Sequence, residues 1–440
     1  MRITSRLICL LTPILLVASC GCSKGTTRQS SKSDESATFS ALQTGHQALT
    51  IAIPVSIDLT DAAADTALST ASAIVQGNTL PSGSKCNLFL ERSGHIQQSI
   101  NGITNVDSVV SAQKLCTEPN GASAYLHEVP VISYCGGIQV VQGCSEIGLP
   151  CMIVSGYDVP NQTVEGILWA HEFGHTKGLT HRGDTNALMN PVAAAGHLSV
   201  NVQECASLVS APMLQTAPKI LRFQAQSGNI SLRDFVHEST SSGEFDILTA
   251  KKYGSQSVSQ LISLLNSPAE KPYATTIVKL LGILGDDKTV GSLVTYVHKG
   301  SGEITPSDYR SKIAAILSIG YIANAHYVHN PIDEDGGPAL IFLSKLASTN
   351  AADSLLGTWH LKGQELKNRD SDAIRTAVLG LGVSGSPQAA KVLDALTERT
   401  ESFGLAPQGV EIRDVLDIAK KDNLMVNEQG LEKYYRSSRQ

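Results

Sequence analysis

The feature that most constrains the fold is a cluster of histidines near the middle of the chain. His171 and His175 are four residues apart, so on a helix their side chains share one face and can bind the same metal ion. Gly178 can adopt the positive φ that ends a helix, and the resulting turn brings His181 towards the same ion. Three imidazoles leave the fourth position of a tetrahedral site open. The spacing therefore predicts a helix, a glycine turn and a Zn²⁺ site.

Two further residues belong to the predicted site. Glu172 directly follows the first ligand, and from there its carboxylate can take a proton from a water on the metal. Met189 lies in the apolar segment 187–191, which is typical of a tight turn, and its side chain can form a hydrophobic floor beneath the metal. The alternative is a coincidental helix with core histidines and a core methionine, and the agreement between motif and context disfavours it.

Together these residues resemble the metzincin metalloproteases, whose signature is the long histidine motif followed by a methionine turn. The likeness is greatest to a matrixin-type catalytic domain, because the His-Leu-Ser segment 197–199 leads into 200–208, where matrixins carry a Leu-Ser pair and a closing helix. The resemblance implies an α+β domain with a mixed sheet, an active-site helix and a Met-turn. It also implies hydrolysis of peptide bonds by a zinc-activated water.

Two positions depart from the family pattern. Arg182, just after the third histidine, matches none of the best-known residues that label the metzincin subfamilies. Pro191 stands where some metzincins carry a tyrosine, so stabilisation of the oxyanion would rest on zinc and backbone groups. Asp184 has two interpretations, an exposed loop residue or a hydrogen-bond partner of a histidine ligand.

The N-terminal residues predict an exported, lipid-anchored protein. Two arginines precede an apolar stretch at 7–16, which is too short to span a bilayer well. The following Val-Ala-Ser-Cys resembles the lipobox of bacterial lipoproteins, which implies a signal peptide at 1–19 and a lipid on Cys20. A polar run then predicts a flexible tether at 20–45. The expected location is the bacterial cell envelope, at the outer membrane or facing the periplasm. The alternative is an ordinary secretory signal and a secreted protein.

Six cysteines lie within the predicted catalytic region, and the sequence after that region has none. In an exported protein an even set of cysteines confined to one domain predicts disulfides, and we expect at least two. The alternative is a set of small buried side chains, partly unpaired. The six are Cys86, Cys116, Cys135, Cys144, Cys151 and Cys205.

Apolar patterns predict the elements around the zinc site. The resemblance implies that the strand at 151–155 is the sheet edge that pairs with an extended substrate. The alternative for this apolar run is a buried strand. Strands are expected at 50–59, 86–91, 129–135, 138–141 and 151–155, and helices at 61–76 and 164–177.

Towards the C-terminus the pattern changes to successive apolar helices. Three segments, 281–285, 316–320 and 378–382, repeat an apolar run that ends in glycine, spaced by about one and two lengths of a two-helix repeat. They resemble an all-α HEAT-like solenoid, and a compact irregular helical domain is the alternative. The expected parts after the tether are a metzincin-like domain at 46–216, a linker at 217–250 and a helical repeat domain at 251–440.

These features predict a zinc-dependent endopeptidase in the envelope, with Glu172 as base and a protein or peptide as substrate. The helical repeats would bind a protein partner, and the N-terminal lipid a membrane. Nucleic acid is not expected as a partner, because the net charge is -6 and no basic cluster occurs. Two alternatives are an interaction protein that works through the solenoid and a zinc hydrolase of a cell-wall polymer. His326 and His329 are assigned polar roles outside any metal site, since no third ligand is near them in the sequence.

Overall fold

The computed structural model describes most of the chain from residue 44 onwards. The signal peptide predicted at 1–19, Cys20 and most of the tether at 20–45 lie outside the described residues. Within the described ranges, no helix is long and apolar enough to cross a membrane. These ranges are 44–99, 102–117, 125–145, 148–156, 162–184, 186–191, 196–210, 230–242, 247–333, 335–348, 353–403 and 410–438.

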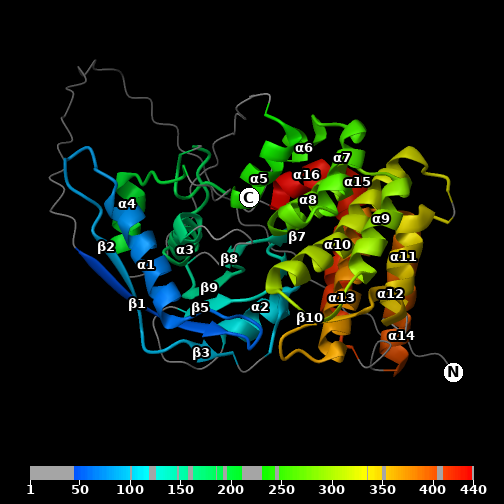
Figure 1. Ribbon diagram of the computed structural model, residues 1–440, viewed down its shortest axis with the longest axis horizontal. Coiled ribbons are helices and arrows are strands. Elements are labelled where there is room, and N and C mark those ends of the chain that lie inside the picture. Colours follow the sequence, from blue (N-terminus) through cyan, green and yellow to red (C-terminus); the bar gives the residue numbers. More distant parts are fainter. Residues whose placement is uncertain are drawn as a thin grey trace, which may run out of the picture. The chain divides into compact units, whose positions relative to one another are not determined.

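A mixed six-stranded sheet supports the first half of the structure (Figure 1). Its strands are β1 (Gly45–Ile53), β2 (Leu88–Arg92), β3 (Gln97–Gln98), β5 (Tyr125–Glu128), β8 (Gly143–Ser145) and β9 (Cys151–Val154). Five of them lie in the order β2-β1-β5-β9-β8, and β3 pairs with the C-terminal end of β1. All neighbours are parallel except β8, which is antiparallel to β9 and forms one edge.

The prediction that 151–155 form the edge strand is wrong. β9 lies between β5 and β8, and its four residues are all buried, as is usual for an apolar run inside a sheet. The edge is β8, whose sequence Gly-Cys-Ser carries no apolar signal. An extended chain that pairs with this side of the sheet would therefore add to β8.

Two helices, α1 (Asp61–Gln76) and α3 (Gln162–Thr176), pack side by side on one face of this sheet (Figure 1). α1 begins where the Thr60 hydroxyl accepts a hydrogen bond from the amide of Ala63. Its buried side chains recur every three or four residues and so form one apolar face. That face closes a core over β1 and β5 together with Trp169 and Phe173 of α3. α3 is thus held firmly above the sheet.

A second, smaller sheet contains β4 (Asn105–Val106), β6 (Val131–Tyr134) and β7 (Ile138–Val141). β6 is parallel to β4 and antiparallel to β7. Successive side chains of a strand point to opposite faces. Accordingly Ile132 packs in a cluster with residues of β9 and of α2 (Val109–Cys116), whereas Val131 joins the core of the helical region. The small sheet therefore belongs to both halves of the structure.

Three disulfides link elements of the first half, which confirms the prediction of at least two. They are Cys116–Cys151, between α2 and β9, Cys135–Cys144, between the β6–β7 turn and β8, and Cys86–Cys205, between the residues before β2 and α4 (Val202–Val209).

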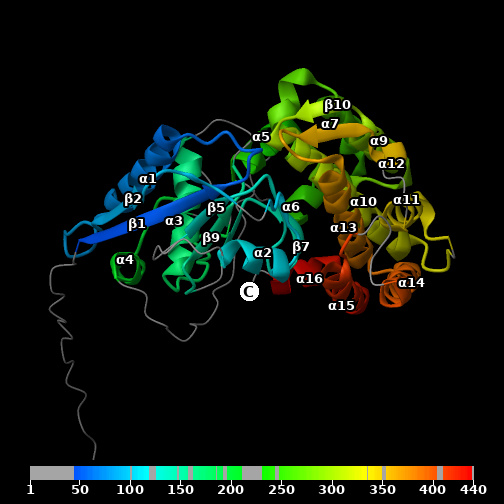
Figure 2. The ribbon, with the colours of Figure 1, turned by 90° about the horizontal axis from the view of Figure 1, so that it is seen from below.

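The second half is built from two layers of helices (Figure 2). The helices are α8 (Ala274–Leu284), α9 (Asp287–His298), α10 (Pro306–His329), α11 (Gly337–Ser348), α13 (Leu366–Ser384), α14 (Pro387–Phe403) and α15 (Arg413–Gln429). Those of the first layer, α8, α10, α13 and α15, lie side by side in that order. In the second layer α9, α11 and α14 follow one another and pack against the first. Consecutive helices thus alternate between the layers.

Two of the three repeated glycines, Gly320 and Gly382, lie where helices of the first layer meet. A Cβ on Gly320 of α10 would lie 2.5 Å from the carbonyl oxygen of Gly380 of α13. One on Gly382 of α13 would lie 2.8 Å from Cα of Ala419 of α15. Glycine allows two backbones to approach this closely because it has no Cβ. At these two positions the glycine of the repeated segment therefore allows a close contact between neighbouring helices.

Several short elements were not predicted individually from the sequence. α5 (Leu232–Ser242) lies inside the linker predicted at 217–250, α6 (Ile247–Lys251) overlaps its end, and both pack against α8. Their apolar residues, such as Phe235 and Ala250, belong to the core of the helical region. The other elements are α7 (Val258–Leu265), α12 (Asp353–Leu356), α16 (Leu431–Ser438), the parallel pair β10 (Ser301–Ile304) and β11 (Thr358–Leu361), and 3-10 helices at Ser255–Ser257 and Pro268–Tyr273.

Buried polar contacts join the small sheet to the helices. Arg375 of α13 forms ion pairs with Asp107, which follows β4, at 2.5 Å and with Asp414 of α15 at 2.7 Å. Arg310 of α10 donates a hydrogen bond of 2.8 Å from Nε to the carbonyl of Pro130. The described residues accordingly form one compact unit.

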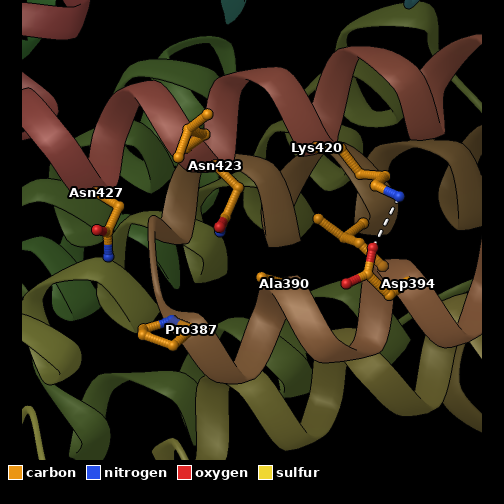
Figure 3. Close-up of a pocket in the computed structure, with 8 residues that line it drawn as sticks. Pro387, Ala390, Asp394, Lys420, Asn423 and Asn427 are labelled. Carbon is orange, nitrogen blue, oxygen red and sulfur yellow. Dashed lines mark ion pairs between the residues drawn. The ribbon is translucent and has the colours of Figure 1, made fainter.

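A groove of about 230 Å³ lies between α14 and α15 (Figure 3). At one end Lys420 and Asp394 form an ion pair of 2.7 Å. Asn427 lies towards the other end, where its amide donates a hydrogen bond of 2.7 Å to the carbonyl of Gly385. The groove thus has polar ends and contains apolar side chains such as Leu393.

Candidate metal centre

Helix α3 and the turn after it bring the three predicted histidines together. His171 and His175 lie on successive turns of α3, and both are buried. Gly178 has a φ of 82°, which confirms the predicted left-handed turn. The amide of Leu179 then donates a hydrogen bond of 3.0 Å to the carbonyl of Gly174, which closes the end of the helix. The chain turns back, and the exposed His181 reaches the same point.

The imidazoles converge through one nitrogen each. Nε2 of His175 lies 3.1 Å from Nε2 of His171 and 3.1 Å from Nε2 of His181. The candidate ligand atoms of the three residues all lie within 4.8 Å of one another. Two nitrogens on a tetrahedral zinc ion are about 3.3 Å apart, given a Zn–N bond of about 2.0–2.1 Å. The spacing therefore fits three ligands of one zinc ion.

Backbone carbonyls fix the protonation of two of these rings. Nδ1 of His171 lies 2.8 Å from the carbonyl oxygen of Leu188, and Nδ1 of His175 lies 2.8 Å from that of Leu179. A carbonyl only accepts, so each Nδ1 carries the hydrogen and each Nε2 presents a lone pair. Burial, together with a neighbouring imidazole, lowers the pKa of His171 and of His175 to about 3. Both rings are thus neutral and oriented as metal ligands require.

Glu172 lies between α3 and the edge strand. Its side chain is buried, and a Cβ on Gly143 of β8 would lie 2.0 Å from its Oε1. The carboxyl group therefore occupies the space that the missing side chain of Gly143 leaves. Because Glu172 directly follows His171 on α3, this places a carboxyl group between the histidine-bearing helix and the strand edge.

Met189 lies directly against the ligand helix. It is fully buried, and a Cβ on Gly174 would lie 2.4 Å from its Sδ. The turn around it is held by a hydrogen bond of 3.0 Å from the amide of Asn190 to the carbonyl of Ala187. Met189 thus packs against α3 at Gly174, one residue before His175.

Asp184 also holds this turn. Its carboxylate accepts a hydrogen bond of 3.0 Å from the amide of Asn186, and its carbonyl accepts one of 2.9 Å from the side chain of Asn190. The residue is exposed, in agreement with the interpretation as a loop aspartate.

Sequence reasoning missed two residues near the centre. Arg182 was singled out only as a departure from the family pattern, yet its guanidinium contacts Ser199 and Glu204. After burial and the neighbouring His181, His197 is a further cause of the lowered pKa of His171. The sequence Asn-x-x-Glu at 201–204 is a capping box that signals the start of α4. No local pattern signals the contact between Arg182 and that helix.

Comparisons with known proteins gave distant structural similarities alone. No protein-family model matches the chain, and no curated protein matches its sequence. The archaemetzincin of Methanopyrus kandleri is 18% identical over 37% of this chain and 93% of its own, with a TM-score of 0.27. Metalloproteinase-II of Bacteroides fragilis is 11% identical over 39% of this chain and 54% of its own, with a TM-score of 0.28. This chain thus spans about half the length of the latter protein.

Proposed function

We propose that this chain is a zinc-dependent endopeptidase with a matrixin-like metzincin domain. The proposal is carried by one observation, the convergence of three Nε2 atoms on one point. On two of these rings a backbone carbonyl accepts the hydrogen of Nδ1, which leaves Nε2 free to bind a metal. His171, His175 and His181 would hold zinc, which when bound supplies a Lewis acid for a scissile carbonyl and lowers the pKa of a water. Glu172 accepts the proton of the attacking water and returns it to the leaving amine. Met189 supports the ligand helix from below.

Zinc content and peptide cleavage, measured on the same preparations, test this function. The wild-type protein is expected to bind one zinc ion and to cleave members of a peptide library. Glu172→Gln is expected to retain zinc and lose cleavage, because Gln has the shape of Glu but cannot accept the proton. Glu165→Gln, on the same helix, is the matched control and should remain active. Zinc-free wild-type protein, or full activity of Glu172→Gln, would contradict the proposal. Cleavage of purified cell wall without cleavage of peptides would favour the alternative polymer hydrolase.

The helical region is proposed to bind a protein partner as a HEAT-like repeat module. The alternation of helices between two layers and the groove between α14 and α15 support this role. A pull-down with the catalytically inactive Glu172→Gln protein is expected to retain the partner, and substitution of groove residues should release it. If the partner is still retained after those substitutions, the groove does not take part in binding it.

Export with a lipid on Cys20 is also proposed. The three disulfides support it, since disulfides persist in oxidising compartments outside the cytosol. Metabolic labelling with a fatty acid is expected to mark the wild-type protein and not Cys20→Ala. Equal labelling of both would contradict the lipid site.

A further inference from the structure

The third ligand has a different setting from the other two. His171 and His175 lie on a buried helix, whereas His181 is exposed and lies on the loop that follows Gly178. A loop residue keeps a fixed position only where neighbouring contacts restrain its backbone. The residue next to it, Arg182, makes such contacts from both its backbone and its side chain.

Arg182 joins the loop to two other segments. Its amide donates a hydrogen bond of 2.7 Å to the carbonyl of Met189, in the turn beneath the ligand helix. Its Nη2 donates to the carbonyl of Ser199 at 2.9 Å and to the hydroxyl of Ser199 at 2.8 Å. Its Nε lies 3.3 Å from Oε1 of Glu204. The guanidinium group therefore bridges the segment after the turn and helix α4.

Glu204 offers a fixed anchor. One carboxylate oxygen accepts a hydrogen bond of 2.9 Å from the amide of Asn201, and the amide of Glu204 donates one of 2.8 Å to the Asn201 side chain. This reciprocal cap fixes the start of α4. The next residue, Cys205, is joined by a disulfide to Cys86. The Glu204 side chain is 8% exposed, so solvent screens its ion pair with Arg182 only weakly.

Ser199 is anchored as well. Its amide donates to the carbonyl of Asn186 at 2.7 Å, and its carbonyl also accepts a hydrogen bond of 2.8 Å from the amide of Leu188. The carbonyl of Leu188 in turn lies against Nδ1 of His171. Arg182 thus contacts a segment that already restrains one ligand of the centre.

We propose that Arg182 is a positioning residue that places the metal ligand His181 by anchoring its loop to helix α4 through Glu204. The proposal rests on the function proposed above. It makes α4, which contributes no ligand, a determinant of metal affinity. Contacts of this kind around metal ligands change affinity by about 10- to 100-fold.

Metal affinity, measured by competition with a chelator, tests the proposal on four variants. Arg182→Ala and Glu204→Gln are each expected to weaken zinc binding by about 10-fold or more. The double variant should lose no more than Arg182→Ala alone, because Glu204 acts on the loop through Arg182 while Arg182 also contacts Ser199. Arg92→Ala is the matched control, since Arg92 forms ion pairs with Asp61 and Asp65 away from the site. It should keep the wild-type affinity.

The visible spectrum of the Co²⁺-substituted protein gives a second readout. Its absorption reports the geometry of the ligands, so Arg182→Ala should shift it and Arg92→Ala should not. Unchanged affinity and spectrum in folded Arg182→Ala would overturn the proposal. If Arg182→Ala does not fold, Glu204→Gln, which keeps the size of the side chain, takes its place. Unchanged affinity and spectrum in that variant would then overturn the proposal. Wild-type protein that binds no zinc would instead refute the proposed function itself.

Discussion

Gly143 and Glu172 occupy adjoining space across the candidate site. A Cβ added to Gly143 would lie 2.0 Å from Oε1 of Glu172 and 2.5 Å from its Cδ, closer than atoms can approach. The φ of Gly143 lies outside the left-handed region, so space and not backbone conformation excludes a side chain there. The edge strand thus contains a gap in which the carboxyl group is seated.

Gly143→Ala is therefore expected to impair catalysis without removing the metal. The new methyl group pushes the Glu172 carboxyl from its place, and a misplacement of about 1 Å can lower kcat by about 100-fold. Gly196→Ala is the control, because a Cβ there meets no atom within 4 Å. Steady-state kinetics and zinc content of the two variants give the comparison. A Gly143→Ala enzyme with wild-type kcat would show that the gap has no role in placing the base.

The convergence of the three histidines could be predicted from the sequence because its geometry is local. Two histidines four apart on a helix and a glycine turn determine most of the arrangement of His171, His175 and His181. The contacts of Gly143 and Arg182 join segments far apart in the chain, and no local spacing encodes them. The edge strand was misplaced for a related reason. An apolar run such as 151–155 is typical of a buried strand, while β8 is too short and polar to be recognised.

Close contact between α10 and α13 predicts a large effect at Gly320. Gly320→Ala would bring a Cβ within 2.5 Å of the carbonyl oxygen of Gly380, and relief of this clash is expected to lower the free energy of unfolding by about 1–3 kcal/mol. Gly291→Ala, at an exposed position of α9 where a Cβ meets no atom within 4 Å, should instead raise it by about 0.5–1 kcal/mol. Urea denaturation of both variants measures the difference. Equal changes in the free energy of unfolding for the two variants would mean that α10 and α13 can move apart without loss of stability.

The ion pairs of Arg375 predict that the two halves unfold together. Arg375→Met leaves Asp107 and Asp414 without their cation in a buried setting, at an expected loss of about 3–5 kcal/mol in the free energy of unfolding. Lys420→Met removes the exposed pair with Asp394 and should cost about 0–1 kcal/mol. Calorimetry of the wild-type protein is expected to show a single unfolding transition that includes both halves. Two separate transitions in the wild-type protein would contradict a shared core.

A buried carboxyl group predicts how stability depends on pH. Burial, with a further contribution from the charge of Glu165 and an opposing one from Arg310, raises the pKa of Glu128 from its ordinary 4.5 to about 8. Between these values the unfolded chain releases the proton while the folded protein keeps it. The free energy of unfolding therefore falls as the pH rises from 4.5 to about 8. Glu128→Gln removes this group, so chemical denaturation across the range should show a flatter dependence. If the free energy of unfolding of Glu128→Gln falls with pH as steeply as that of the wild-type protein, groups other than Glu128 cause the dependence.

The helical half was predicted in outline and not in detail. Long apolar helices and their repeated glycines are strong local signals, and the structure has helices at each. α5 and α6 were missed because they are short and lie next to polar sequence, and their packing against α8 stabilises them. The pairing of β10 with β11 depends on helices that hold the two segments together, and such tertiary contacts leave no periodic pattern.

The disulfide Cys86–Cys205 encloses every residue assigned to the metal centre within one covalent ring. A single backbone cut between these cysteines leaves both fragments in the same molecule. Such a nicked protein would keep its mass on a non-reducing gel and separate into two bands only after reduction. A cut in that stretch thus releases no fragment until the disulfide is reduced.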